Sequence, residues 1–182
     1  FARRLTREVT ALMDHKALTP YADLKKQLDR RVASAPLALP SPAAAALDGP
    51  ALYARARASV LVMCQPYKCG KCSHWHVNFS SAFALTADGA VAANYHSMKS
   101  TNTEAMVVAT ADGRLYPVRE VLAASAEDDA VLLRVEARNL VPLPLAADEP
   151  VGRPVSVVSH PDRQFFVMTR GHVSRYYVER GP

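Results

Sequence analysis

The sequence predicts a mainly β protein with an α-helical extension at its N-terminus. Apolar residues recur at helical spacing in the first third of the chain, and a stretch rich in alanine and proline follows. From residue 58 onward, short β-rich runs alternate with turn signals. Many short strands without intervening helices are typical of an antiparallel barrel or sandwich, and they argue against a parallel sheet.

The helical extension is expected to cover residues 1–32 and to contain two helices. The first apolar stripe, at spacing i, i+4 and i+7, consists of Leu5, Val9 and Leu12. Thr19 and Pro20 form an N-cap and first-turn pair for a second helix. The apolar stripe of that helix consists of Tyr21, Leu24, Leu28 and Val32. We interpret each stripe as a surface that docks on the rest of the protein and not as a cofactor site.

Residues 33–48 are predicted to form a linker. Alanine and proline dominate this stretch, and its prolines are Pro36, Pro40 and Pro42. Proline lacks the amide donor that helices and central strands require, so this composition sustains neither. A short helix is expected to restart near Pro50 and to run through Tyr53 and Ala56.

The β region is predicted to contain eight strands. These are Ser59–Cys64, Val77–Leu85, Val91–Asn94, Met106–Thr110, Leu115–Ala123, Ala130–Val135, Val155–Ser159 and Phe165–Val173. Two Asp-Gly dipeptides, Asp88-Gly89 and Asp112-Gly113, favour hairpins because both residue types tolerate positive φ.

Composition excludes several classes of protein. The net charge of +5 is modest, and 49% of the 182 residues are hydrophobic, as in ordinary globular domains. Apolar runs such as Val60–Met63 are far too short to cross a bilayer, so no membrane insertion is expected. The basic residues of the predicted helices come without an aromatic platform or a nucleic-acid motif. We therefore interpret them as a solvated face and expect no nucleic-acid partner.

Residues 80–96 carry the first of three motifs that resemble a known family. They read S-S-A-F-A-L-T-A-D-G followed by A-V-A-A-N-Y-H. This strand, Asp-Gly turn and strand ending in histidine resembles the trypsin-like serine proteases of the bacterial HtrA-related kind. The resemblance implies that His96 is the general base. Ala93 and Ser97 depart from the residues common in that family, but neither is a reacting group.

The second motif supplies the carboxylate. Residues 106–118 resemble the second hairpin of the family, and residues 129–135, D-A-V-L-L-R-V, resemble the segment that carries its aspartate. The match implies that Asp129 orients His96. Asp128 fits instead if the register shifts by one residue.

The third motif extends the resemblance to the end of the chain. Residues 142–145, 151–161 and 171–174 resemble the connection between the two barrels and the first strands of the second. The implied fold consists of two antiparallel six-stranded-type β-barrels, the second incomplete, within a protease domain over residues 49–182. The first barrel is expected at about residues 58–138 and the start of the second at about 150–182.

The family's Gly-x-Ser-Gly motif, which carries its nucleophile, is absent from these residues. Ser174 has no flanking glycines, and Ser80 and Ser81 precede His96 on a strand, so none is assigned as nucleophile. The nucleophilic serine and the oxyanion hole are expected beyond Pro182, in a segment that the chain lacks through truncation or cleavage.

The implied activity is that of a serine endopeptidase, a hydrolase that acts on polypeptides and needs no cofactor for catalysis. The alternative, from a different class, is an inactive pseudoprotease or a binding or scaffold domain, stabilised by zinc in one version. The resemblance also implies a bacterial protein that is periplasmic or secreted. The oligomeric state stays open.

Five cysteine and histidine residues lie close together in the sequence. They are Cys64, Cys69, Cys72, His74 and His76, in the pattern C-x4-C-x2-C-x-H-x-H. Such a group can close a tetrahedral structural zinc site. A disulfide, which leaves one cysteine free, and three free thiols are the other interpretations. His160 and His172 lack a partner motif and are expected in structural or surface roles.

Overall fold

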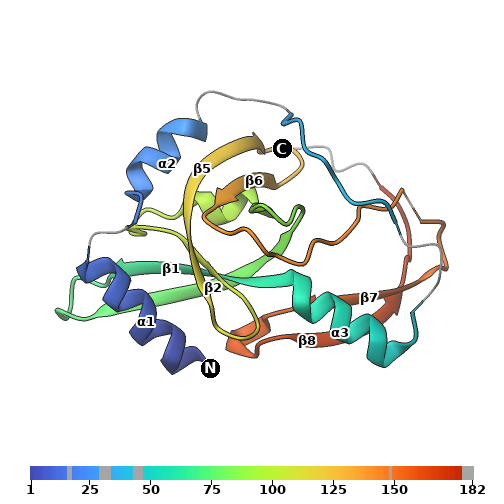
Figure 1. The fold of residues 1–182 in the computed structure, drawn as a ribbon, viewed down its shortest axis with the longest axis horizontal. Coiled ribbons are helices and arrows are strands. Elements are labelled where there is room, and N and C mark those ends of the chain that lie inside the picture. The colour runs from blue at the N-terminus through green and yellow to red at the C-terminus, as the bar shows by residue number, and fades with distance from the viewer. Residues whose placement is uncertain (16–17, 29–33, 43–46, 148, 178–182) are drawn as a thin grey trace.

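Six antiparallel strands close into a barrel at the centre of the structure (Figure 1). The structure is a computed structural model that describes residues 1–15, 18–28, 34–42, 47–147 and 149–177. The barrel strands are β1 (Val60–Lys68), β2 (Trp75–Ala84), β3 (Ala90–Asn94), β4 (Val107–Ala109), β5 (Leu115–Ser125) and β6 (Ala130–Val135). They follow the order β1-β2-β3-β6-β5-β4, and pairing of β4 with β1 closes the barrel. The predicted first barrel is therefore present.

The barrel interior is filled by apolar side chains from facing strands. Leu61, Met63, Val91, Val108 and Leu133 are all fully buried. They belong to one cluster that includes residues from every strand of the barrel. Burial of such side chains is the main term that holds the strands together.

The two N-terminal helices pack against the barrel. Helix α1 (Ala2–Asp14) buries Leu5 and Val9 completely in an apolar cluster with β1, β2 and β4. Helix α2 (Tyr21–Leu28) contributes Leu24 to the interior cluster. Both predicted stripes dock as expected, although Val32 lies outside the described residues.

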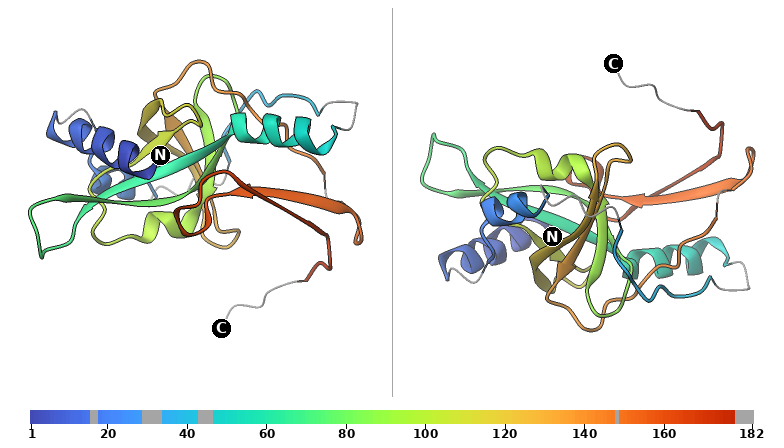
Figure 2. Two further views of the ribbon diagram at one scale, coloured as in Figure 1. Left: turned by 90° about the horizontal axis from the view of Figure 1, so that it is seen from below. Right: turned by 90° about the horizontal axis from the view of Figure 1, so that it is seen from above.

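A hydrogen bond also ties α2 to the barrel wall. The amide of Val121 on β5 donates to Gln27 Oε1 at 2.7 Å. The helices therefore cover the barrel itself (Figures 1 and 2).

The predicted linker leads to helix α3 (Gly49–Ser59). Residues 34–42 form neither helix nor strand. Asp48 caps α3, since its carboxylate accepts a hydrogen bond from the Ala51 amide at 2.8 Å, and Pro50 lies in the first turn. The helix therefore begins where the sequence predicts, and it leads directly into β1.

The two Asp-Gly turns have the same construction. Each has the sequence Thr-Ala-Asp-Gly, at residues 86–89 and 110–113. The threonine hydroxyl donates to the aspartate carboxylate and accepts from the amide four residues on. Gly89 and Gly113 adopt φ of +102° and +87°, which glycine tolerates best.

A two-stranded hairpin follows the barrel. It consists of β7 (Pro154–Ser159) and β8 (Val167–His172) and lies beside α3 (Figure 2). A second barrel was expected here, and the described residues form this two-stranded hairpin at that place. None of the described helices combines the length and the apolar character that crossing a bilayer requires.

Candidate active site

Pairing of β3 with β6 brings together the histidine and the aspartate that the sequence singles out. Asn94, the last residue of β3, pairs with Ala130, the first residue of β6. His96 follows β3 in the 3₁₀ helix η1 (Tyr95–Lys99), and Asp129 immediately precedes β6. The two side chains therefore meet at one end of this strand pair.

The Asp129 carboxylate holds His96 through both of its oxygens. Oδ2 lies 2.7 Å from Nδ1 of the imidazole, and Oδ1 accepts the His96 backbone amide at 2.8 Å. Because one carboxylate binds both the ring and the main chain of the same residue, it fixes the position of the imidazole. Nε2 has no hydrogen-bond partner among the described residues and remains available for a reacting group.

Hydrogen bonds, of which the His96 amide is the most important, lower the pKa of the Asp129 carboxyl below its ordinary value. The carboxylate is therefore ionised at neutral pH. Asp129 has a φ of +48°, in the left-handed region that aspartate and asparagine enter more readily than most residues. Its neighbour Asp128 accepts instead from the Ser125 hydroxyl at 2.6 Å. The structure thus places Asp129, and not Asp128, against His96.

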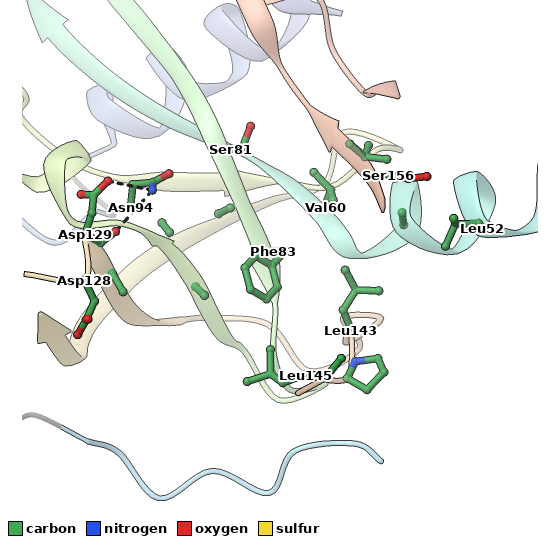
Figure 3. A pocket seen from close by; sticks show the side chains of 18 residues that line it. Leu52, Val60, Ser81, Phe83, Asn94, Asp128, Asp129, Leu143, Leu145 and Ser156 are labelled. Atoms are coloured by element: carbon green, nitrogen blue, oxygen red, sulfur yellow. Dashed lines mark hydrogen bonds between the residues drawn. The ribbon is translucent and has the colours of Figure 1, made fainter. Parts of the chain in front are cut away.

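Asn94 is a further member of the site that the sequence analysis did not assign. Its side-chain amide donates to Asp129 Oδ2 at 3.1 Å (Figure 3). The sequence could have indicated this residue, because Asn94 lies two positions before His96 in the first motif.

Gln65 supports the other side of η1. The side chain of Gln65 is buried and donates to the Ser97 carbonyl at 2.8 Å. This contact joins β1 to the residue after His96, and no sequence motif indicated it.

A groove of about 660 Å³ begins at Asn94 and Asp129 and runs between the barrel and the β7 side of the hairpin. Its walls are mostly apolar. Phe83 lies in the middle, and Leu143 and Leu145 lie on one side (Figure 3). An apolar groove with a few polar groups at one end is the usual form of a site that binds organic ligands.

No hydroxyl of the described residues donates to His96. Ser80 has a buried hydroxyl without a partner, and Ser81 lines the groove. Ser174 donates to the carbonyl of His172 at 3.4 Å. In the described part of the chain, no serine hydroxyl is hydrogen-bonded to His96 or Asp129; that of Ser97 donates to the Asn94 carbonyl at 2.6 Å.

The structure brings together three of the five predicted metal ligands. Cys69, Cys72 and His76 place their ligand atoms within 4.8 Å of one another. Cys64 is fully buried in the cluster beneath α1, where burial raises the pKa of its thiol far above the ordinary value. His74 lies outside the three-residue group. The expected set of five is therefore corrected to three.

His160 has the structural role that the sequence suggests. It is buried, its Nε2 donates to the Leu61 carbonyl at 3.2 Å, and its Nδ1 accepts the Phe166 amide at 3.0 Å. The first hydrogen bond joins the β7–β8 hairpin to β1, and the second closes the connection between β7 and β8. His172, in contrast, is exposed at the end of β8.

Comparison with known proteins identifies the family of the domain. Residues 80–182, more than half of the chain, match the family model of the trypsin-like peptidase domain. No curated protein sequence is significantly similar to the chain.

Two solved structures resemble the chain in fold. The HtrA-type protease AlgW with a decapeptide has a TM-score of 0.59 and 19% identity, over 66% of this chain and 43% of that one. A variant of AlgW with a tripeptide has a TM-score of 0.56 and 21% identity, over 67% of this chain and 38% of that one. The chain therefore spans less than half the length of these structures.

Proposed function

The chain belongs to the trypsin-like peptidase domain family, and on that premise we propose that it is the His- and Asp-bearing part of a serine endopeptidase. The observation that carries the proposal is the contact of His96 Nδ1 with Asp129 Oδ2 at 2.7 Å, with Nε2 left unpaired. In this proposal His96 is the general base and Asp129 orients it.

The chemistry follows from the geometry. With Nδ1 held by Asp129, the neutral imidazole carries its proton on Nδ1 and presents a lone pair on Nε2. Nε2 takes the proton of a serine hydroxyl as the hydroxyl oxygen attacks the peptide carbonyl, and later gives that proton to the leaving amine. The Asp129 carboxylate stabilises the imidazolium that forms between these steps.

We propose that the nucleophilic serine and the oxyanion hole come from a segment after Pro182. Two observations support this placement. No described serine hydroxyl is hydrogen-bonded to His96, since that of the adjacent Ser97 donates to the Asn94 carbonyl at 2.6 Å. The hairpin β7–β8 has no further strands paired to it among the described residues.

The proposed substrate is a polypeptide. HtrA-type proteases of the same fold are known with a decapeptide and a tripeptide. The apolar groove that starts at Asn94 and Asp129 offers a surface for peptide side chains next to the reacting groups. The resemblance to HtrA-type proteases also supports the proposal that this is a bacterial protein that acts in the periplasm or is secreted.

A fluorophosphonate probe tests the proposal. We expect the full-length gene product to gain one covalent adduct, detected as an increase in intact mass, and to hydrolyse an unstructured polypeptide. Asp129→Asn keeps a side chain that tolerates the left-handed backbone but removes the charge, and it is expected to lower kcat by about 10³–10⁴-fold. His96→Ala is expected to abolish measurable labelling.

Two matched variants control for nonspecific effects. Asp128→Asn makes the same change one residue away, where the carboxylate binds Ser125, and His15→Ala removes an exposed histidine at the end of α1. Both are expected to label like the wild type. A full-length protein that takes no adduct would refute the peptidase proposal and support the second candidate, a binding domain that lacks the nucleophile.

A further inference from the structure

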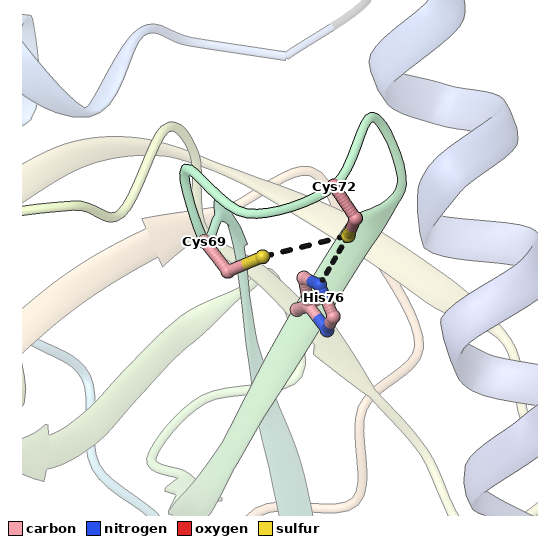
Figure 4. Close-up of side chains that lie close together, drawn as sticks. All are labelled: Cys69, Cys72 and His76. Carbon is pink, nitrogen blue, oxygen red and sulfur yellow. Dashed lines mark hydrogen bonds between the residues drawn. The ribbon is translucent and has the colours of Figure 1, made fainter.

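The loop between β1 and β2 carries a cluster that the peptidase chemistry does not use. The cluster consists of Cys69, Cys72 and His76 and lies at the tip of the β1–β2 hairpin (Figure 4). We propose that these three residues bind one zinc ion, which fixes the tip of the β1–β2 hairpin.

The distances within the cluster fit zinc. The two sulfur atoms lie 3.4 Å apart, and Cys72 Sγ lies 3.1 Å from His76 Nε2 (Figure 4). Tetrahedral zinc with Zn–S of about 2.3 Å and Zn–N of about 2.05 Å requires sulfur–sulfur and sulfur–nitrogen separations of about 3.8 and 3.6 Å. These two separations therefore differ from the zinc values by about half an ångström or less, and the third pair, Cys69 and His76, lies within 4.8 Å.

A disulfide explains less of the arrangement. It requires the sulfur atoms to approach to about 2.05 Å, a larger movement than zinc requires. It also gives no reason for an imidazole nitrogen to point at Cys72 Sγ. Two thiolates and one imidazole are the donor set that zinc prefers, and together with the ion they leave no net charge.

The surrounding loop holds these ligands in place. Gly70 adopts φ of +73°, which turns the chain sharply between the two cysteines. Lys68 Nζ donates to the Ser73 carbonyl at 2.6 Å and lies over the Trp75 ring, 4.1 Å from its centroid. The loop is therefore closed before metal enters it.

The ring of His76 is also positioned by a neighbour. It packs against Tyr67, its partner in the β1–β2 ladder, with ring centroids 5.3 Å apart. This packing restricts the orientation of the imidazole ring.

The hairpin tip is the part of β1 with the fewest strand pairings, so a bound zinc ion would stabilise it most. Pairing of β1 with β4 covers only Val62–Cys64, whereas pairing with β2 continues to Lys68. Beyond Cys64 the tip is supported by β2, by the contact of Gln65 with η1, and by a short bridge to Thr103. Among the described residues, no further histidine, cysteine or acidic side chain joins these three as a fourth ligand. The fourth coordination position of the zinc is therefore open to water.

Metal content of the chain purified under reducing conditions without chelator tests the proposal. We expect one zinc per chain and a native mass about 63 Da above that of the apoprotein, because two thiol protons leave as zinc binds. At zinc 100-fold above its Kd, Tm is expected to rise by roughly 5–10 °C relative to the apoprotein.

Matched variants identify the ligands. Cys72→Ser and His76→Ala are expected to lose the zinc. Cys64→Ala and His74→Ala change the same residue types outside the group and are expected to keep it. Loss of zinc from His74→Ala equal to that from His76→Ala would overturn the assignment.

Two results would overturn the site as a whole. One is a chain purified without reductant or chelator that holds no zinc and is about 2 Da lighter than its reduced mass, which is the signature of a disulfide. The other is zinc-free protein that, on addition of Co²⁺, shows no thiolate-to-cobalt charge-transfer absorption. The cobalt experiment uses the wild-type chain and does not depend on the folding of any variant. Neither measurement involves peptidase activity, so each proposal can fail without the other.

Discussion

Replacement of His160 tests how the β7–β8 hairpin is held against the barrel. The imidazole is buried and makes two hydrogen bonds, one to the Leu61 carbonyl and one from the Phe166 amide. His160→Ala leaves both backbone groups in a buried region without that partner. An unsatisfied buried group costs about 1–3 kcal/mol, so two such groups are expected to lower the free energy of unfolding by about 2–6 kcal/mol. The loss of ring packing on Phe165 and Phe166 adds to this destabilisation.

The same residue predicts a pH dependence. Burial lowers the pKa of His160 below its ordinary value of 6.5. The unfolded chain therefore binds a proton at higher pH than the folded protein, and protonation favours unfolding. The stabilisation is fully present above about pH 6.5 and is lost as the pH falls toward the folded-state pKa.

Urea unfolding at a series of pH values measures both effects. His172→Ala is the matched control, because it removes an exposed histidine from the same hairpin. His160→Ala is expected to show a lower midpoint at pH 7.5 and a weaker dependence on pH between about 6.5 and 5 than the wild type. If His160→Ala unfolds at the same urea concentration as His172→Ala, or keeps the full pH dependence, the reasoning is wrong.

Three further substitutions test the fold, each by urea unfolding. Gly89→Ala would place a Cβ 2.3 Å from a backbone carbonyl oxygen at a φ of +102° and is expected to cost more than about 2 kcal/mol. Gly152→Ala, at a φ of +90° in open space, is expected to cost about 1 kcal/mol, and equal costs would contradict the clash. Gln65→Met removes the donor to η1 and is expected to cost about 1–3 kcal/mol; an unchanged midpoint would show that this bond contributes nothing. Leu24→Ala empties a fully buried position and is expected to cost about 2–5 kcal/mol, whereas Leu39→Ala, at an exposed position in the linker, should cost almost nothing.

The sequence predicts the barrel well because its strands obey local rules. The two Asp-Gly turns fix the hairpin ends, and the strand predicted at Ala130–Val135 has the same bounds as β6. The prediction that the first strand ends at Cys64 is wrong, because β1 continues to Lys68 through Pro66.

Proline is tolerated at position 66 for a reason that lies outside the strand itself. Pairing of β1 with β4 ends at Cys64, and the Pro66 carbonyl accepts the Glu104 amide on that side. The β1–β4 ladder therefore does not require a backbone N–H at position 66, which proline could not supply. The position of β4 that permits this is a tertiary fact, which the sequence of β1 does not contain.

The proposed metal ligands show a similar limit. Cys64 pairs with Phe79, and Tyr67 pairs with His76, three positions farther along the same hairpin. Three strand residues span about 10 Å, so Cys64 is too distant to join the other ligands. His74 precedes β2, so the alternation of strand side chains does not place it on the same side as His76. The spacing of cysteine and histidine in the sequence indicates a cluster. Which of these residues lie close together depends on the pairing register of β1 and β2.

The aspartate shows what the first barrel contributes to the proposed reaction. Sequence alignment left Asp128 and Asp129 as alternatives, and hydrogen bonding to Asn94 and His96 separates them. All of these contacts come from β3, η1 and the residue before β6, and none requires the β7–β8 hairpin. A barrel that orients the imidazole by itself has this half of the site preorganised before any nucleophile arrives. In the proposed enzyme, the hairpin and the chain that follows it would position the serine. We therefore expect the attachment of the hairpin through His160 to affect catalysis as well as stability.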